Sequence, residues 1–363
     1  MHNVLVLGGT GAIGKHLVQW LSKECIVTVT SRSKHEDEFH VEYIKGNARD
    51  NAFLEEILSK RYDAIVDFMR YGTEEFALRV DKLLQNTDHY LFISSARVYS
   101  KSVNPIKETS SRLLDVCKDE EYLSTDEYAL SKARQENILQ SKDLRNWTII
   151  RPYITYSENR LQLGTLEKEE WLFRAICGKK VVFSEDILNK YTTLTYGKDV
   201  SEAIARLTCK EEAKGEVFHI TGGKPITWKQ VLSIYANAFF EETGKNMDYV
   251  LTKESLNLKL GKAAYQVQYD RLYDRVFSDE KIKTIIDTSS FKSPEEGLSE
   301  CIKSMIHSKK FNFINWEKEA LLDKQSHEFA RLSHFSTKKD MLRYYVVRFM
   351  PLFLYLKIRK NIY

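Results

Sequence analysis

Short apolar runs alternate along the chain with longer stretches in which apolar residues recur every three or four positions. The short runs have the length of buried strands, and the longer stretches have the period of helices that bury one face. Expected strands lie at 4–7, 26–30, 41–47, 64–69 and 90–95, and expected helices at 13–21, 53–60 and 74–86. This alternation predicts an α/β protein with a doubly wound parallel sheet.

The first strand runs directly into a glycine cluster, Gly8-Gly9-Thr10-Gly11-Ala12-Ile13-Gly14. Glycines let the backbone turn and approach a pyrophosphate closely, and the N-terminus of the following helix offers free N–H groups and a partial positive charge. A glycine-rich turn without a ligand is the alternative interpretation. In its strand and helix context the cluster indicates a Rossmann-type dinucleotide site, with these expected contacts: Gly8, Thr10, Gly11, Ala12, Ile13 and Gly14.

The end of the second strand bears on the choice between NAD and NADP. An NAD site commonly has an acidic residue there for the ribose 2′-hydroxyl, whereas this chain has Ser31 and Arg32, with Lys34 close by. A hydroxyl and a guanidinium suit a 2′-phosphate, which favours NADP(H) over NAD, although both cations could simply be solvated loop charges. Asn47, near the adenine, and Phe68, after the fourth strand, complete the expected cofactor contacts.

A candidate catalytic group follows the fifth strand. Thr125 or Asp126 is placed to cap a helix on which Tyr128 and Lys132 stand one turn apart on one face. A neighbouring ammonium favours the phenolate form of a tyrosine and so makes it a better acid–base catalyst near pH 7. A serine at the end of the fifth strand could complete the site by hydrogen-bonding a substrate oxygen.

Over roughly residues 1–300 the sequence resembles the extended short-chain dehydrogenase/reductase family, which includes nucleotide-sugar epimerases, dehydratases and reductases. The motifs that carry the resemblance are GGTGAIG, SSARVY, YALSK with Glu136-Asn137, and Arg151-Pro152. The resemblance implies that Tyr128 is the general acid/base, that Lys132 holds the nicotinamide ribose, and that Ser95 orients the substrate oxygen. It also implies hydride transfer at a sugar carbon of a nucleotide-diphosphate sugar, and a homodimer.

Departures from the family pattern narrow the expected activity. The dehydratases carry Thr-Asp-Glu where this chain has Ser95-Ala96-Arg97, so 4,6-dehydration is not expected. After the fourth strand, Asp67-Phe68-Met69-Arg70 replaces the small residues that usually lie beside the cofactor. Ser31-Arg32 suits an NADP(H)-dependent reductase of a keto group, in cell-surface polysaccharide biosynthesis. An NAD-dependent nucleotide-sugar epimerase is the alternative, followed by a non-catalytic relative that binds a dinucleotide or RNA.

The second half of the chain offers fewer chemical signals. Arg271 and Arg275 are candidates for the substrate diphosphate, which arginines near this position bind in resembling enzymes, or they pair with Asp270 and Asp274 on the surface. Trp171, Phe173 and Phe183 are expected in the core of a smaller domain, and 227–241 is expected to be an amphipathic helix capped by threonine. The histidines form no metal-ligand pattern, and no metal is expected.

Composition sets the remaining expectations. A hydrophobic fraction of 43% and a charged fraction of 29% are those of a globular protein of two domains or one large one. We expect a dinucleotide-binding domain at 1–155, with returning segments near 190–225, a substrate-binding part at 156–300 and a basic helical extension at 301–363. Five scattered cysteines indicate a reducing compartment, and an initial strand leaves no room for a signal peptide, so a cytoplasmic protein is expected.

The positive charge is concentrated at the C-terminal end. Residues 301–363 hold 13 Lys and Arg against 5 Asp and Glu, whereas the rest of the chain carries a net charge of −4, which argues against nucleic acid as the main partner. The apolar run at 344–356 is too short and too interrupted to span a bilayer. Residues 342–360 suit a contact with an anionic membrane surface, at the inner membrane face, or with a partner protein. Packing on the protein's own body or on a second subunit is the alternative.

Overall fold

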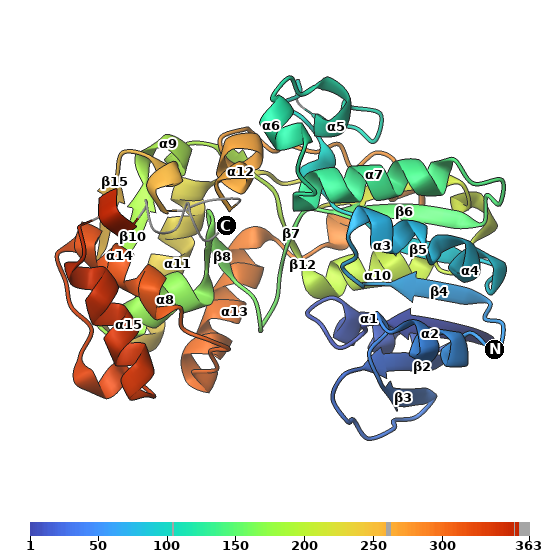
Figure 1. Ribbon diagram of the computed structural model, residues 1–363, viewed down its shortest axis with the longest axis horizontal. Coiled ribbons are helices and arrows are strands. Elements are labelled where there is room, and N and C mark those ends of the chain that lie inside the picture. The colour runs from blue at the N-terminus through green and yellow to red at the C-terminus, as the bar shows by residue number, and fades with distance from the viewer. Residues whose placement is uncertain (104, 259–262, 352, 356–363) are drawn as a thin grey trace. The chain divides into compact units, whose positions relative to one another are not determined.

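The computed structural model describes residues 1–103, 105–258, 263–351 and 353–355 (Figure 1). Its contacts divide the chain into two compact units. The first contains residues 1–157, 193–225 and 275–294, and the second contains 158–192, 226–274 and 295–363. Residues 275–294 thus return to the first unit, and the basic segment that begins at 301 belongs to the second.

The first unit is built on a seven-stranded parallel sheet in the order β13-β6-β5-β4-β1-β2-β3 (Figure 1). Its strands are β1 (His2–Leu7), β2 (Cys25–Ser31), β3 (Val41–Lys45), β4 (Ala64–Asp67), β5 (Tyr90–Ile93), β6 (Trp147–Pro152) and β13 (Glu216–Ile220). The order reverses direction between β1 and β4, and ligands of open α/β sheets bind at such a point, beyond the carboxyl ends of the strands. The glycine cluster that follows β1 lies at this position.

The central strands are buried on both faces because helices cover each side, whereas the edge strand β3 is partly exposed. In β1, Val4 and Val6 belong to one apolar cluster and Leu5 and Leu7 to the other, as the two-residue period of a strand requires. The helices of this unit are α1 (Gly14–Leu21), α2 (Asn51–Ile57), α3 (Thr73–Ala77), α4 (Val80–Gln85), α5 (Leu113–Val116), α6 (Glu120–Leu123), α7 (Tyr128–Gln140) and α10 (Gly197–Leu207). The predicted doubly wound α/β fold is confirmed.

The helix expected at 74–86 is two helices, so its continuity was predicted wrongly. The break falls at Leu78 and Arg79, where Arg79 leaves helical geometry with φ −122°. This turns the Arg79 side chain inward, where its guanidinium donates to Asn51 Oδ1 at 3.0 Å and stands 4.8 Å from the Tyr71 ring centre.

The second unit has shorter strands than the first unit and consists mainly of helices. It contains α8 (Lys168–Ile176), α9 (Glu185–Leu188), α11 (Trp228–Thr243), α12 (Ala264–Gln266), α13 (Pro294–Ser308), α14 (Trp316–Ser326) and α15 (Lys338–Phe349). Short two-stranded pairs join β8 (Gln162–Leu163) to β9 (Leu166–Glu167), β10 (Val181–Ser184) to β15 (Tyr249–Thr252), and β11 (Tyr191–Thr192) to β14 (Ile226–Thr227). In the first unit β12 (Leu194–Tyr196) pairs with β7 (Ile154–Tyr156).

The core of the second unit contains the expected aromatic residues. Trp171 and Phe183 are fully buried, and Trp171 stacks on Tyr235 with ring centres 4.3 Å apart. The predicted amphipathic helix is α11, and Thr227 caps it by accepting a hydrogen bond from the Gln230 N–H at 3.2 Å, as expected.

The basic C-terminal segment packs on this second unit through a buried ion cluster. Arg174 of α8 donates to Glu319 and Asp323 of α14, both at 2.8 Å. Lys179 donates to the same two carboxylates at 2.7 and 2.6 Å. Packing on the protein's own body therefore accounts for α14 and for the inner face of α15, which lies against it (Figure 1). In the described part of the chain, no helix has the length and apolar character needed to cross a bilayer.

Candidate active site

The turn between β1 and α1 has the geometry of a phosphate-binding loop. Gly8 has φ +72°, which favours glycine, and its N–H donates to Thr30 Oγ1 at 3.1 Å. A Cβ on Gly14 would lie 2.6 Å from the Gly9 carbonyl oxygen, so only glycine lets α1 approach the turn this closely. A Cβ on Gly11, by contrast, would meet no protein atom within 4 Å. The backbone at Gly11 therefore faces open space, and a pyrophosphate fits there.

Helix α10 also contacts this turn. Ser201 of α10 donates from its hydroxyl to the Ile13 carbonyl at 2.8 Å, and Gly197 brings the start of α10 close to Ala12. Thr10 and Gly11 are exposed, while Ala12 and Ile13 are half-buried. The six residues predicted from the glycine cluster thus lie in one turn that α10 contacts, with Thr10 and Gly11 at its exposed part.

The residues after β2 and β3 divide into structural and exposed ones. The Ser31 hydroxyl accepts from the Ser33 N–H at 3.2 Å and hydrogen-bonds His35 Nε2 at 3.1 Å, so it supports the loop itself. Arg32 is exposed. Asn47 is also exposed, and its side-chain oxygen accepts from the Arg49 N–H at 3.2 Å. Of Ser31 and Arg32, the two residues predicted to contact the 2′-phosphate, Arg32 is the one whose side chain a ligand in solution can reach.

The end of β4 packs against the glycine turn. A Cβ on Gly8 would lie 3.0 Å from Met69 Sδ and 3.8 Å from the Cβ of Phe68. Asp67 is fully buried and accepts hydrogen bonds from the Tyr90 hydroxyl and the Met69 N–H, both at 2.8 Å. Burial raises the pKa of the Asp67 carboxyl, although these bonds and the Lys132 ammonium act against the rise.

Helix α7 carries the candidate acid–base pair. Tyr128 is its first residue and Lys132 lies one turn later, as predicted. The predicted cap was wrong: Glu127 caps the helix by accepting from the Ala129 N–H at 2.8 Å. Thr125 donates to the Tyr122 carbonyl, and Asp126 accepts from the Thr73 hydroxyl and, within α7, from the Ser131 hydroxyl at 3.2 Å.

Lys132 is buried in a mixed electrostatic environment. It is 3% exposed, and its Nζ stands 4.4 Å from the centre of the Phe92 ring. Burial lowers the pKa of Lys132 to about 8, and the Arg70 guanidinium contributes to the lowering, whereas Asp67 and Glu136 oppose it. At neutral pH the ammonium form still predominates.

Two arginines that were not predicted as site residues flank the Tyr128 ring. The guanidinium carbon of Arg70 lies 5.1 Å from the ring centre and that of Arg97 lies 5.4 Å from it. Arg97 also donates to the Glu127 carboxylate at 2.8 Å and so connects the end of β5 to the cap of α7. The substitution of small residues by Met69-Arg70 after β4 was the sequence signal that could have identified Arg70.

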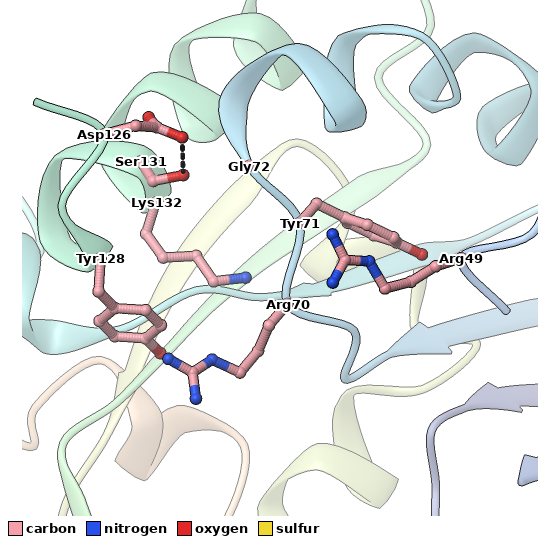
Figure 2. A pocket seen from close by; sticks show the side chains of 8 residues that line it. All are labelled: Arg49, Arg70, Tyr71, Gly72, Asp126, Tyr128, Ser131 and Lys132. Atoms are coloured by element: carbon pink, nitrogen blue, oxygen red, sulfur yellow. Dashed lines mark hydrogen bonds between the residues drawn. The ribbon is translucent and has the colours of Figure 1, made fainter. Parts of the chain in front are cut away.

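A cavity of about 500 Å³ brings several of these groups together (Figure 2). Of the predicted residues, Tyr128 and Lys132 line it, and Lys132 extends toward Arg70 (Figure 2). The full lining is Arg49, Arg70, Tyr71, Gly72, Asp126, Tyr128, Ser131 and Lys132. Arg49, Arg70 and Lys132 contribute cations to this lining and Asp126 contributes a carboxylate, while Arg49 also donates to Glu75 at 2.9 Å.

The two serines at the end of β5 have different partners. Ser94 donates to the buried Glu136 carboxylate at 2.6 Å, and Glu136 also accepts from Arg151 at 2.8 Å. The Ser95 hydroxyl accepts from the Arg97 N–H at 3.2 Å and keeps its own hydrogen for another acceptor. Ser95 is therefore the serine of the pair whose bonding suits contact with a substrate oxygen.

The two arginines expected at the substrate diphosphate are both buried. Arg271, in the second unit, pairs with Asp270 and donates to the Gly164 carbonyl at 3.0 Å. Arg275, in the first unit, donates to the carbonyls of Ser100 and Tyr99, both at 3.1 Å. Their contact with substrate stays a prediction. Among the described residues, no group of three His, Cys, Asp or Glu side chains is arranged to hold a metal ion.

Comparison with known proteins finds one relative in sequence and several proteins of similar fold. A curated relative, the chloroplast stem-loop binding protein of 41 kDa b from Arabidopsis thaliana, is 27% identical over 252 residues, which cover 65% of this chain and 62% of the relative. An epimerase from the methanogen Methanothermobacter thermautotrophicus has a similar structure, with a TM-score of 0.64 at 18% identity over 90% of this chain and 96% of the other. A UDP-glucuronic acid 4-epimerase from Bacillus cereus, solved with UDP-glucuronic acid and NAD, has a TM-score of 0.61 at 17% identity over 85% of this chain and 100% of the other.

The comparison that decides the family is with a family model. Residues 4–221, which include the glycine turn, Ser95, Tyr128 and Lys132, match the model of the NAD-dependent epimerase/dehydratase family. This match spans more than half of the chain and the whole predicted site apart from Arg271 and Arg275. The chain belongs to the NAD-dependent epimerase/dehydratase family, of the extended short-chain dehydrogenase/reductase type.

Proposed function

We propose that the protein is an NADP(H)-dependent reductase of a keto group on a nucleotide-diphosphate sugar, in cell-surface polysaccharide biosynthesis. The observation that carries the proposal is the placement of Tyr128 and Lys132 in one cavity with the cations Arg49 and Arg70. A proton donor beside several cations suits a reaction that protonates a carbonyl oxygen on an anionic substrate.

The cofactor assignment rests on the turn and on Arg32. The open space at Gly11 and the close approach at Gly14 fit a pyrophosphate, and a bound dihydronicotinamide would supply a hydride to the keto carbon. β2 ends in Ser31, where an NAD site commonly has an acidic residue, and the exposed Arg32 follows directly. A guanidinium there supports a 2′-phosphate and therefore NADP(H).

The roles of the side chains follow from their bonding. Tyr128 donates its hydroxyl proton to the carbonyl oxygen as that oxygen becomes an alkoxide. The Lys132 ammonium stabilises the tyrosinate that remains, and it is charged at neutral pH because its pKa is about 8. Ser95 accepts from the Arg97 N–H and directs its own hydrogen to the same carbonyl oxygen.

Two other functions use parts of the same site. A nucleotide-sugar epimerase would use Tyr128, Lys132 and Ser95 with a cofactor that stays bound. A non-catalytic relative that binds RNA is supported by the similarity to the Arabidopsis stem-loop binding protein. The chain spans 62% of the length of that relative, and a direct RNA-binding measurement tests this function.

The deciding experiment is a titration of the purified protein with NADPH and NADH. We expect tighter binding of NADPH, and we expect Arg32→Ala to remove most of that preference. Arg206→Ala is the matched control, because Arg206 is an exposed arginine paired with Glu202 on α10. Oxidation of NADPH by 4-keto sugar nucleotides should then be lost in Tyr128→Phe.

Other results would redirect the assignment. NAD that co-purifies and does not exchange, or a preference for NADH, would favour the epimerase. Binding of neither dinucleotide, with binding of a stem-loop RNA, would favour the non-catalytic relative. Activity that survives Tyr128→Phe would contradict the catalytic role in both enzyme hypotheses.

A further inference from the structure

Helix α15 presents two opposite apolar faces, and within the described part of the chain one of them is buried and the other is exposed. Tyr344 and Val347 lie on the inner face and are 0% and 5% exposed. Tyr344 donates its hydroxyl hydrogen to Asp323 of the buried ion cluster. The inner face therefore fixes the orientation of α15 on the second unit.

The outer face carries a stripe of large apolar residues. Leu342, Val346 and Phe349 are 64%, 47% and 68% exposed, and their spacing of four and three residues places them on one side of the helix. In the turn that follows the helix, Phe353 is 74% exposed and Leu354 is 40% exposed. Single exposed apolar residues are ordinary on a protein surface, but a contiguous stripe of this kind marks an interaction site.

A neighbouring loop extends this stripe. Phe329 is 51% exposed, and its ring centre lies 6.2 Å from that of Phe349. The Arg348 guanidinium carbon stands 4.1 Å over the Phe329 ring and places a cation beside the two aromatic rings. We use the term outer stripe for Phe329, Leu342, Val346, Phe349, Phe353 and Leu354.

The charges around the outer stripe are almost all positive. Lys338, Lys339 and Arg343 are exposed and project from the same half of α15 as the stripe, by the helical period. Among the described residues of 338–355 the cations are Lys338, Lys339, Arg343 and Arg348, and the acidic residue is Asp340. Asp340 accepts a hydrogen bond from the Thr337 hydroxyl at 2.7 Å and so serves the helix cap.

We propose that the outer stripe of α15 docks the protein on an anionic lipid bilayer surface. The apolar side chains would enter the headgroup region, and the flanking lysines and arginines would pair with lipid phosphates and carboxylates. The charge distribution of the whole chain supports this orientation, because residues 1–300 carry a net charge of −4 and would be repelled by the same surface.

Two other occupants fit the outer stripe less well. A second copy of the chain, packed through the same stripe, would bring Lys338, Lys339 and Arg343 against the same cations of the other copy. RNA would engage the cations and the phenylalanine rings, but it offers no apolar surface to cover Leu342, Val346 and Leu354. A bilayer satisfies the charges and the aliphatic side chains together.

Co-sedimentation with vesicles tests this proposal. The full chain should bind vesicles of phosphatidylcholine with phosphatidylglycerol, should bind pure phosphatidylcholine vesicles weakly, and should lose affinity as salt increases. Lys338→Gln with Lys339→Gln should weaken binding about 30-fold, at about a tenfold change per 1.4 kcal/mol and about 1 kcal/mol for each basic residue. Leu342→Ser with Phe349→Ser should weaken it further, while dinucleotide binding stays unchanged.

The controls separate docking from loss of folding and from other partners. Phe240→Ser removes an aromatic residue of α11 that is 53% exposed, and it should leave vesicle binding unchanged. The altered side chains are exposed, so circular dichroism and melting temperature should match those of the wild type. The proposal is overturned if anionic vesicles do not bind, if the Leu342 and Phe349 variant binds them as well as the wild type, or if that variant instead converts a dimer to a monomer. Binding of an RNA through Lys338 and Lys339 without vesicle binding would overturn it as well.

Discussion

The guanidinium of Arg70 lies 5.1 Å from the centre of the Tyr128 ring and also lowers the pKa of Lys132. Arg70 follows β4, whereas Tyr128 and Lys132 belong to α7. One cation from a separate element of the same unit thus acts on both members of the candidate acid–base pair. It also faces the cavity in which a substrate would have to bind.

Replacing Arg70 should therefore change the pH dependence of the reaction. In Arg70→Gln the pKa of Lys132 should rise, because a cation that disfavours the ammonium is removed. The alkaline fall of kcat/KM should move to higher pH, and KM for an anionic substrate should rise about tenfold through the lost charged contact. The measurement is a pH profile of NADPH oxidation. Arg61→Gln, which alters an exposed arginine paired with Asp88, should change neither quantity.

The burial of Lys132 should cost stability at neutral pH. Its pKa in the folded protein, about 8, lies below the ordinary value, so the folded state holds the charged amine at a cost below pH 8. Between about pH 8 and 10.4 the unfolded chain still binds the proton while the folded protein has lost it. The cost therefore decreases as the pH rises through this range. Lys132→Met should therefore stabilise the fold by about 1–3 kcal/mol at pH 7 and by less at pH 9.5, while activity is lost.

Melting temperatures at the two pH values measure this effect. Lys45→Met, at the exposed end of β3, is the matched control and should shift neither value. A lower melting temperature for Lys132→Met at pH 7 would mean that the attraction between Lys132 and Asp67 outweighs the burial of the amine.

Substitutions at two glycines of the turn should have different effects, one on dinucleotide binding and the other on the stability of the fold. Gly11→Ala adds a Cβ to open space, so the melting temperature should stay near that of the wild type while dinucleotide affinity falls about tenfold or more, through lost phosphate contact. Gly14→Ala places a Cβ 2.6 Å from the Gly9 carbonyl oxygen, so the fold itself should be destabilised. Isothermal titration and thermal unfolding of both variants test this. Equal loss of stability in the two would contradict the assignment of Gly11 to ligand contact.

The parts of the site that could be predicted are those encoded within a few neighbouring residues. The glycine turn and the Tyr128–Lys132 pair are local patterns, because a tight turn and one helical turn fix their geometry. Arg70 and Arg97 could not be predicted as neighbours of Tyr128, since only the sheet brings the ends of β4 and β5 to the start of α7. The cap of α7 was missed for a similar reason: Asp126 is held by Thr73, 53 residues away.

His89 should make the stability of the first unit sensitive to acid. It is fully buried, and its Nε2 lies 2.7 Å from Thr148 Oγ1. Burial lowers the pKa of His89 to about 4, so the unfolded chain binds a proton that the folded protein does not as the pH falls from about 6.5 to 4. The free energy of unfolding should fall by up to about 3 kcal/mol over this range through His89 alone.

Urea unfolding at several pH values measures this loss. In His89→Gln the slope of stability against pH should be smaller by about one proton, or about 1.4 kcal/mol per pH unit. His2→Gln, whose side chain is 62% exposed, should keep the slope of the wild type. Identical slopes for His89→Gln and the wild type would show that another group carries the acid sensitivity.

The buried ion cluster of Arg174, Lys179, Glu319 and Asp323 should contribute strongly to holding α14 and α15 on the rest of the second unit. Arg174 is 0% exposed, and it donates to four residues of the C-terminal segment: Glu319, Asp323, Ser326 and Glu328. Its removal leaves buried carboxylates with Lys179 as the main remaining cation. Arg174→Met should destabilise the second unit by about 3–5 kcal/mol. Arg206→Met, which breaks an exposed pair on α10, should cost about 1 kcal/mol or less.

Limited proteolysis locates this destabilisation within the chain. In Arg174→Met, cleavage should appear first between α14 and α15, because the cluster joins α14 to α8 and holds Tyr344 of α15 through Asp323. The cost of Arg174→Met comes from two buried carboxylates that are left with Lys179 as their one shared cation. Replacing Arg174, Lys179, Glu319 and Asp323 together by apolar residues of similar volume should therefore restore stability. Resistance of Arg174→Met to the protease, with unchanged unfolding, would mean that the aromatic contacts of Trp316 and Tyr344 hold the segment without the ions.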